Sequence, residues 1–200
     1  MLEVKDATIT AWGKTVVTGL SFMVRDGQLT CVTGSEHSGK TTLLRTLMGF
    51  LPVEKGFVSI DGELLTVLSA PVFRSLMVYL PQGMQMLAHQ YRIPKAPVCQ
   101  ADEYGVWNTL LPAVEPEPSP VPLTPEETFS LAERTLCEAA DKPIVIADEP
   151  AAYLTPELTQ RMMELLLQQA AMGKTVLIAS RKPQLVAMAQ QVIDLDILSI

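Results

Sequence analysis

The sequence predicts an α/β protein with a mostly parallel sheet flanked by helices and an antiparallel β subdomain at the N-terminal end. Short runs that alternate apolar and polar residues fill residues 2–24, as in antiparallel strands. Further along, strongly apolar runs such as QLTCVTG and KPIVIADEP indicate strands buried on both faces. In the second half these runs alternate with segments of helical periodicity, which favours parallel strands joined by crossovers.

The composition fits one packed domain over residues 1–200. The chain has 200 residues, of which 48% are hydrophobic and 18% charged, and a domain of this size can carry a small insertion. The formal net charge of −7 argues against nucleic acid or anionic lipid as the main partner. No run approaches the ~20 apolar residues of a membrane span, and the first residues lack the apolar core of a signal peptide.

The first half of the chain is expected to be mainly β. The expected elements, in order, are strands at residues 2–12, 16–24 and 28–34, a helix at 41–50, a hairpin at 56–65 and a strand at 75–82. Gly13-Lys14 and Asp61-Gly62 supply the turns between paired strands. Gly49 ends the helix.

Residues 84–136 are expected to form a reduced helical and proline-rich subdomain. Six prolines fall between positions 112 and 125, a spacing that forbids a helix and favours extended chain. Helical order resumes at Thr124, an N-cap residue followed by Pro125 at the first helical position. Glu127, three residues after Thr124, completes a capping box.

The last part of the chain is expected to alternate strands and helices. The expected elements are helices at residues 124–140, 156–173 and 183–191 and strands at 142–150, 175–180 and 192–200. The methionine- and leucine-rich face of the second of these helices is expected to pack in the core. Cys31, Cys99 and Cys137 form no CxxC pair, and the apolar surroundings of Cys31 and Cys137 indicate buried, reduced thiols of a cytosolic protein.

The segment GSEHSGKTT, residues 34–42, carries the strongest functional signal. It fits G-x-x-x-x-G-K-[ST], the phosphate loop of P-loop NTPases. The glycines let backbone N–H groups turn inward around an anion, and the helix that follows directs its positive end to the same point. Lys40 is expected to reach the β- and γ-phosphates, and the Thr41 hydroxyl to ligate Mg²⁺. The expected nucleotide-binding residues of this segment are Gly34, Ser35, Glu36, His37, Ser38, Gly39, Lys40, Thr41 and Thr42.

A second functional signal is the pair Asp148 and Glu149 at the end of the apolar run IVIADEP. In a parallel sheet, the carboxyl ends of the strands form the edge where ligands bind. Asp148 is expected to bind Mg²⁺ through water and Glu149 to polarise the attacking water, which makes Glu149 and Lys40 the catalytic candidates. The alternative is that this acidic pair caps a helix beginning after Pro150.

These residues resemble the nucleotide-binding subunit of ATP-binding cassette (ABC) transporters, in order over nearly the whole chain. Residues 34–62 match the family's phosphate-loop segment and the hairpin after it, and IVIADEP matches its magnesium and catalytic-base strand. The resemblance implies that Trp12 stacks on adenine and that Gln82 contacts Mg²⁺ and senses the membrane partner. The alternatives are a half-buried strand aromatic for Trp12 and a plain loop amide for Gln82.

Three features of the family are missing. PLTPE at residues 122–126 occupies the place of the signature LSGGQ, whose glycines and serine would meet the γ-phosphate of a partner subunit. Thr155 stands where the family has an aspartate that links the two sites of a dimer. Arg181 stands where the family has a switch histidine, and the alternative for it is a solvated Arg-Lys pair. His37 and His89 lie elsewhere in the sequence.

The resemblance implies an ATP- and Mg²⁺-dependent ATPase subunit on the cytoplasmic face of the membrane. Its expected partners are a transmembrane permease and a second ATP-binding subunit, in a homodimer or heterodimer, with no nucleic acid. The missing features imply weak or partner-dependent hydrolysis. A regulatory or scaffold subunit with little hydrolysis is the alternative. A kinase or GTPase is disfavoured, because the guanine-reading N-K-x-D motif is absent.

Overall fold

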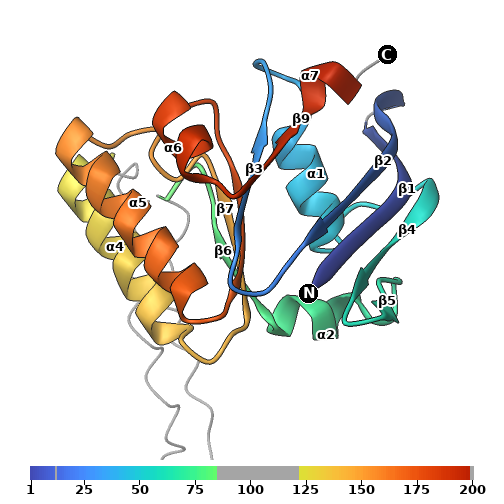
Figure 1. Ribbon diagram of the computed structural model, residues 1–200, viewed down its shortest axis with the longest axis horizontal. Coiled ribbons are helices and arrows are strands. Elements are labelled where there is room, and N and C mark those ends of the chain that lie inside the picture. Colours follow the sequence, from blue (N-terminus) through green and yellow to red (C-terminus); the bar gives the residue numbers. More distant parts are fainter. Residues whose placement is uncertain (12, 85–121, 199–200) are drawn as a thin grey trace, which may run out of the picture.

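The computed structural model describes residues 1–11, 13–84 and 122–198 (Figure 1). Trp12, Cys99 and most of the predicted proline-rich subdomain lie outside these ranges. The elements are β1 (Leu2–Ala11), β2 (Lys14–Val24), β3 (Leu29–Thr33), α1 (Lys40–Leu47), β4 (Lys55–Ile60), β5 (Glu63–Leu64), α2 (Ala70–Ser75), β6 (Met77–Leu80), α4 (Pro125–Glu138), β7 (Ile144–Asp148), α5 (Pro156–Ala171), β8 (Thr175–Ala179), α6 (Pro183–Met188), β9 (Gln191–Asp194) and α7 (Leu195–Leu198).

The central sheet has the order β6-β7-β8-β3-β9, and every neighbouring pair in it is parallel. The strands therefore present their carboxyl ends at one edge. At that edge, β3 ends at Thr33 and the phosphate loop follows it. β7 ends there at Asp148, and β8 ends just before Ser180. This topology brings segments far apart in sequence to one place, as the sequence predicts.

The second sheet is antiparallel, with the order β2-β1-β4-β5. β1 and β2 pair through the turn before Lys14, and β4 and β5 pair across Asp61 and Gly62. Both of these turn residues have a positive φ, of 50° and 86°, as a tight hairpin turn requires. The predicted antiparallel subdomain and its turns are confirmed.

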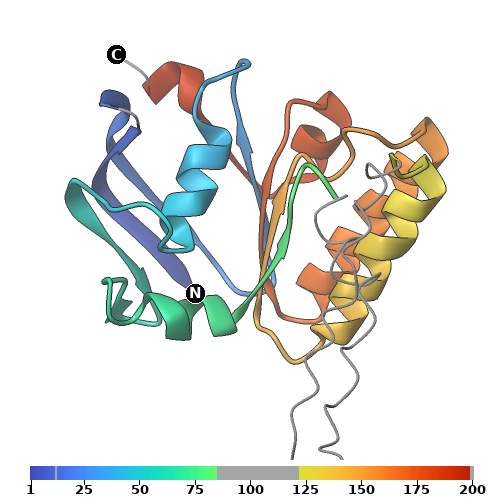
Figure 2. The same cartoon turned by 180° about the vertical axis from the view of Figure 1, so that it is seen from behind.

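Helix α1 lies between the two sheets, and α4, α5 and α6 cover the other face of the parallel sheet (Figures 1 and 2). On α1, the side chains of Leu43, Leu44 and Leu47 are at most 1% exposed and belong to a core shared by both sheets. On α5, Met162 and Leu166 are fully buried in the second core, so the predicted packing of this methionine- and leucine-rich face is confirmed. No helix within the described ranges has the length and hydropathy needed to span a membrane.

The predicted start of α4 is confirmed. The Thr124 hydroxyl accepts a hydrogen bond from the Glu127 backbone N–H, and the Glu127 carboxylate accepts one from the Thr124 backbone N–H. Pro125 is the first residue of the helix. Together these bonds form the capping box that the sequence predicts, and both side chains are hydrogen-bonded within the first turn of α4.

Two predictions about side chains and elements are wrong. The last strand ends at Asp194, and α7 follows it, because the Asp194 side chain accepts the Asp196 N–H and turns the chain into a helix. Cys137 is exposed, because it lies one residue past Leu136 on α4 and off the buried stripe that includes Phe129 and Leu136. Cys31 is free and buried as predicted, and burial raises the pKa of its thiol to about 12.

Candidate functional site

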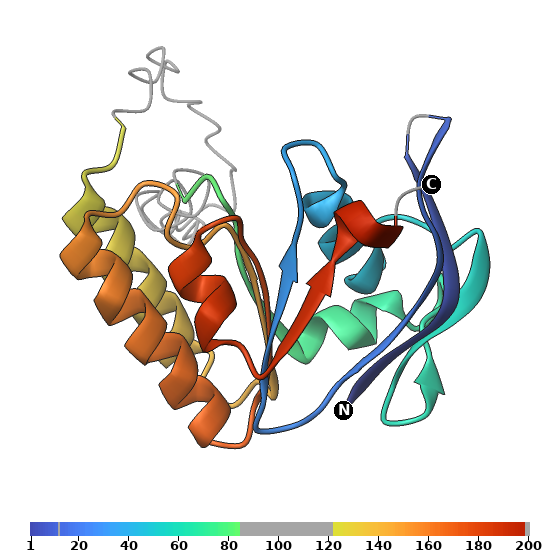
Figure 3. The same ribbon diagram turned by 45° about the horizontal axis from the view of Figure 1, so that its top comes forward.

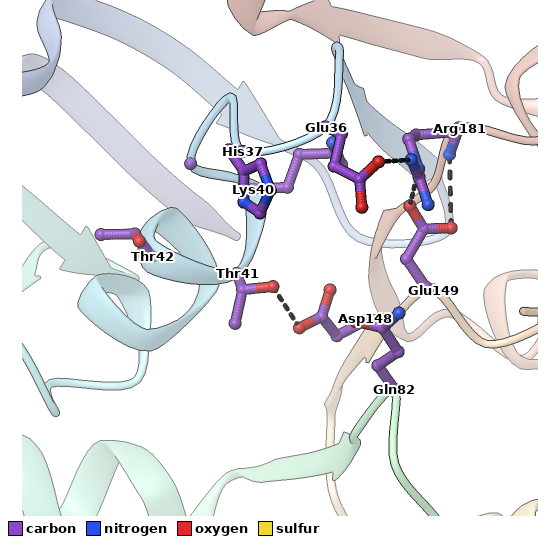
Figure 4. Close-up of a pocket in the computed structure, with 10 residues that line it drawn as sticks. Glu36, His37, Lys40, Thr41, Thr42, Gln82, Asp148, Glu149 and Arg181 are labelled. Carbon is purple, nitrogen blue, oxygen red and sulfur yellow. Dashed lines mark hydrogen bonds and ion pairs between the residues drawn. The ribbon is translucent and has the colours of Figure 1, made fainter.

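A cavity of about 300 Å³ opens at the carboxyl edge of the parallel sheet, next to the N-terminus of α1. Figure 4 shows the side chains around it. The lining residues are Glu36, His37, Gly39, Lys40, Thr41, Thr42, Gln82, Asp148, Glu149 and Arg181. The structure thus brings together the predicted phosphate loop, Gln82 and the acidic pair. Gly34, Ser35 and Ser38 belong to the same loop without lining the cavity, and Trp12 lies outside the described residues.

The phosphate loop has a backbone that requires glycine at position 39. Gly39 has a φ of 95° and is the N-cap of α1. A Cβ placed there would collide with Cγ1 of Val16 on β2, so both the backbone angle and the space exclude a larger residue. The first turn of α1 contains no acidic residue. Its N-terminal N–H groups are therefore not offset by a carboxylate of that turn, which favours an anion in the cavity.

Lys40 is held at the centre of the loop. Its side chain is buried, and its ammonium donates to the carbonyl oxygens of Gly34 (2.9 Å) and Ser35 (2.7 Å) and to the Ser38 hydroxyl (3.2 Å). These three bonds use all the donors that an ammonium has. The loop therefore closes around a positive charge, and a phosphate oxygen would bond to this ammonium in exchange for one of the three loop oxygens.

Thr41 and Asp148 join the loop to β7. The Thr41 hydroxyl donates to Oδ2 of Asp148 at 2.7 Å, and the Tyr79 hydroxyl donates to the same oxygen at 3.5 Å. The pKa of Asp148 is raised, mainly because burial disfavours its charge and also because of the nearby charge of Glu149; the Thr41 bond acts in the opposite direction. Burial and the charge of Asp148 also raise the pKa of Tyr79, to about 12.

The residues present fit a magnesium ion. Oδ1 of Asp148 is buried and has no hydrogen-bond partner, although buried carboxylate oxygens are normally paired. A hydroxyl, a carboxylate and an amide oxygen are hard ligands of the kind that Mg²⁺ prefers. Thr41, Asp148 and Gln82 provide this set around one cavity, and a cation there would offset the cost of burying Asp148.

Glu149 is held in a strained backbone conformation, and both of its carboxylate oxygens accept hydrogen bonds. The backbone φ of Glu149 is 46°, in the left-handed helical region that residues other than glycine rarely adopt. Pro150, which follows it, also disfavours a helical conformation at position 149. Oε2 accepts from the Ser180 hydroxyl (3.2 Å) and the Arg181 N–H (3.4 Å), and Oε1 accepts from Nε of Arg181 (3.3 Å). Strain of this kind gathers where a side chain must point in a set direction. The alternative helix-capping role is wrong, because α5 begins at Pro156 with Thr155 as its N-cap.

Arg181 connects the two walls of the cavity. Besides Glu149, its guanidinium contacts Oε2 of Glu36 on the phosphate loop at 3.4 Å (Figure 4). Its side chain is 47% exposed, so each pair is partly screened by water. The alternative of a solvated Arg-Lys pair holds in part: Arg181 is exposed, but it bridges two carboxylates, while Lys182 donates to the Thr159 hydroxyl.

Sequence reasoning missed Ser180 and Asp196 as parts of this site. Ser180 directly follows β8, at the predicted ligand edge, and this position was the available signal. Asp196 accepts from both the backbone N–H (2.7 Å) and the hydroxyl (2.9 Å) of Ser35. It gave no signal, because it falls in a run that the alternation of apolar residues assigns to a strand.

A protein-family model described as "ABC transporter" matches residues 17–152, more than half of the chain. The chain belongs to the ABC transporter family. The match covers the phosphate loop, Gln82 and the acidic pair, and it ends before β8 and Arg181.

The ABC transporter fold is also seen in solved structures. A bacterial Atm1-family ABC exporter with ATP bound has a TM-score of 0.70 and 19% identity, covering 96% of this chain and 36% of that one. A dimeric post-hydrolysis state of an ATP-binding cassette bound to ADP and Pi has a TM-score of 0.69 and 18% identity, covering 97% of this chain and 94% of that one. At these identities the likeness shows the fold.

Curated relatives within the family are distant and longer. The ABC transporter atnG of Emericella nidulans is 27% identical over an alignment of 184 positions, which covers 84% of this chain and 12% of the relative. The mycobactin import ATP-binding/permease protein IrtA of Mycobacterium tuberculosis is 26% identical over 199 aligned positions, which cover 92% of this chain and 23% of the relative. The Fe(3+) ions import ATP-binding protein FbpC 2 of Rhodococcus jostii is 26% identical over 206 aligned positions, gaps included, which cover 96% of this chain and 58% of the relative. The chain thus spans less than two thirds of each.

Proposed function

We propose that this ABC family member is the ATP-binding subunit of a transporter and couples ATP binding and hydrolysis to movement of a permease partner. The observation that carries the proposal is the convergence of Lys40, Thr41 and Asp148 on one cavity, with Oδ1 of Asp148 buried and unpaired. A cavity that combines a fixed ammonium with a buried carboxylate oxygen suits a polyanion that arrives with a divalent cation.

Binding would use groups that the fold already holds in position. The N-terminus of α1 and the amides of the phosphate loop would receive the β- and γ-phosphates, with Lys40 between them. When bound, Mg²⁺ supplies positive charge that offsets the charge building on the phosphates. Thr41, Gln82 and Asp148 are the residues that would hold it.

Hydrolysis would use Glu149 as the base. The carboxylate would orient a water towards the γ-phosphorus and take a proton from it, while the bond from that phosphorus to the β,γ-bridging oxygen breaks. Ser180 and Arg181 fix the direction of the carboxylate. We expect the rate to be low or partner-dependent, because residues 122–126 contain no glycine and an arginine occupies position 181, where the family has its switch histidine.

The proposal extends to partners and place. The relatives named above include an ATP-binding/permease protein and an import ATP-binding protein, and one structural neighbour is a dimer. We infer for this chain a permease and a second ATP-binding subunit, at the cytoplasmic face of the membrane. We infer from the resemblance that Trp12 stacks on the adenine.

Nucleotide affinity and turnover, measured separately, test the proposal. The dissociation constant for ATP, with and without Mg²⁺, and the steady-state release of phosphate are compared for the wild-type chain, Lys40→Ala, Glu149→Gln and Lys5→Ala, which removes an exposed lysine on β1. Lys40→Ala should lose affinity at least tenfold, and Glu149→Gln should keep affinity and lose turnover. Lys5→Ala should match the wild type in both.

The outcomes separate the possible roles. Wild-type protein that shows no affinity for ATP would overturn the proposal. If Lys40→Ala binds ATP as tightly as the wild type, the phosphate loop is not the nucleotide-binding site. Tight binding with no turnover, alone or with a complete partner subunit, would assign the chain a regulatory role in place of catalysis.

A further inference from the structure

Asp196 lies against the phosphate loop although it is far from it in sequence. Figures 1 and 3 show α7 beside the segment that joins β3 to α1. Oδ2 of Asp196 accepts the backbone N–H of Ser35 at 2.7 Å, and Oδ1 accepts the Ser35 hydroxyl at 2.9 Å. Both carboxylate oxygens thus bond to one residue of the loop.

The position of Asp196 is set by the sheet. β9 pairs in parallel with β3 and places Asp194 opposite Thr33, the last residue before Gly34. Leu195 is fully buried in the core that also contains Val32, which anchors the chain after β9. The Asp196 N–H donates to Oδ1 of Asp194 at 3.0 Å. These contacts hold the Asp196 carboxylate at the start of the loop.

The backbone of Ser35 is therefore hydrogen-bonded at both its N–H and its carbonyl group. Its N–H bonds to Asp196, and its carbonyl oxygen accepts from Nζ of Lys40 at 2.7 Å. A carboxylate and an ammonium therefore fix the two ends of a short segment of backbone that adjoins the anion-binding amides. Hydrogen bonds to charged groups are stronger than neutral ones, so this arrangement restricts the rotation of the peptide planes next to Ser35.

We propose that Asp196 is a positioning residue for the phosphate loop. It withdraws the Ser35 N–H from the amides that face the cavity and turns the Ser35 carbonyl towards Lys40. The ammonium is thereby placed before nucleotide arrives. The carboxylate also brings a negative charge close to an anion site, so its role is geometric, and an amide of the same shape can replace it. The part of this inference that concerns nucleotide rests on the proposed function.

Four variants separate geometry from charge. Asp196→Ala removes both bonds, whereas Asp196→Asn keeps the shape and can both accept from the Ser35 N–H and donate to its hydroxyl. Ser35→Ala removes the hydroxyl bond alone. Ile197→Ala is the matched control, because it truncates a side chain on the same helix that is 78% exposed.

The first readout does not need nucleotide. Hydrogen exchange of the Ser35 amide in the free protein should be slow in the wild type, Asp196→Asn and Ile197→Ala, and at least tenfold faster in Asp196→Ala. Equal exchange in the wild type and Asp196→Ala would overturn the inference even if the chain binds no nucleotide. If Asp196→Ala does not fold, the double variant Asp196→Asn, Ser35→Ala is measured instead. Its backbone amide at position 35 should remain protected from exchange, because the asparagine side chain still accepts that N–H.

The second readout is the dissociation constant for ATP. Asp196→Ala should weaken it about tenfold, Ser35→Ala should change it less than about threefold, and Ile197→Ala should leave it unchanged. Asp196→Asn should equal the wild type or bind more tightly, because it keeps the geometry and loses the repulsive charge. Loss of affinity in Asp196→Asn to the level of Asp196→Ala would overturn a positioning role. Absence of ATP binding by the wild type would instead count against the proposed function.

Discussion

The Thr41 hydroxyl donates a hydrogen bond of 2.7 Å to Oδ2 of Asp148, and this bond joins the first turn of α1 to the end of β7. The two residues expected to share a magnesium ion therefore contact each other directly in the protein itself. Asp148 keeps its other oxygen, Oδ1, buried and unpaired. Burying this unpaired oxygen lowers the free energy of unfolding, and a bound cation would offset that loss.

Asp148→Asn should stabilise the fold and make its stability less dependent on pH. Burial raises the pKa of Asp148 above that of the unfolded chain, so the folded state holds its proton more tightly. The unfolding free energy should therefore fall as pH rises from the unfolded to the folded pKa, and the loss persists at neutral pH. We expect the variant to melt a few degrees higher at pH 7, given about 2–4 °C per kcal/mol for a chain of this size.

Melting curves from pH 4 to pH 8 check this prediction. The difference in melting temperature between the two proteins should grow with pH and shrink in acid. A variant that melts lower than the wild type at pH 7 would contradict the argument. Addition of Mg²⁺ with nucleotide should stabilise the wild type more than Asp148→Asn, because the variant lacks the charged ligand.

Arg181→Ala should weaken ATP binding by about tenfold. The change leaves the carboxylates of Glu36 and Glu149 without their shared cation, on the two walls of a cavity that is to receive a polyanion. Arg181→Lys should lose less, because it keeps the charge but not the forked geometry. The effect should diminish at high ionic strength, because the side chain is partly exposed.

Isothermal titration at two salt concentrations measures the effect. Lys182→Ala is the control, since this neighbouring cation bonds to Thr159 and does not line the cavity. If Lys182→Ala weakens binding as much as Arg181→Ala, the effect is one of overall charge and not of the bridge.

Gly39→Ala should destabilise the fold by at least about 1–3 kcal/mol, the usual cost of a strained backbone conformation. Gly39 has a φ of 95°, and a Cβ there would also meet Val16. Chemical denaturation measures the change in unfolding free energy. In the double variant Gly39→Ala, Val16→Ala the collision is removed, but the backbone strain at position 39 remains. The stability of the double variant should therefore lie between that of Gly39→Ala and that of Val16→Ala. Full recovery would show that φ does not matter at this position.

Thr155→Ala should cost about 1 kcal/mol, because it removes the side chain that accepts the Leu158 N–H at the start of α5. Thr155→Ser and Thr155→Asp should both preserve the melting temperature, since serine and aspartate are good N-caps and a carboxylate is favourable at a helix N-terminus. Thermal melting of the three variants checks this. A melting temperature in Thr155→Asp as low as that in Thr155→Ala would show that the hydroxyl does more than cap the helix.

The phosphate loop and the acidic pair could be predicted from the sequence because each depends on local backbone. Gly39, Lys40 and Thr41 occupy fixed places in a strand-to-helix turn, and Asp148 ends a short apolar run that is typical of a buried strand. The capping box at Thr124 was equally predictable, since two residues three positions apart define it.

The ion pairs of Arg181 with Glu36 and Glu149 could not be predicted, because they depend on the register between β7 and β8. Parallel pairing sets Asp148 opposite Ala179, which brings the residues after β8 next to Glu149. Asp196 depends on the same kind of relationship between β9 and β3. The run that contains it alternates like a strand, but its contact with Ser35 exists only in the folded chain.

The enclosure of α1 between two sheets has a consequence for how a nucleotide could signal. A helix packed on both sides cannot tilt without disturbing its contacts with both sheets, so the phosphate loop is poorly suited to act as a moving part. The opposite wall is built differently: Gln82 is exposed, and Arg181 is held by partly solvated ion pairs. Displacements that begin at the γ-phosphate would therefore be transmitted through the segments after β6 and β8, while α1 remains the stationary reference against which they shift.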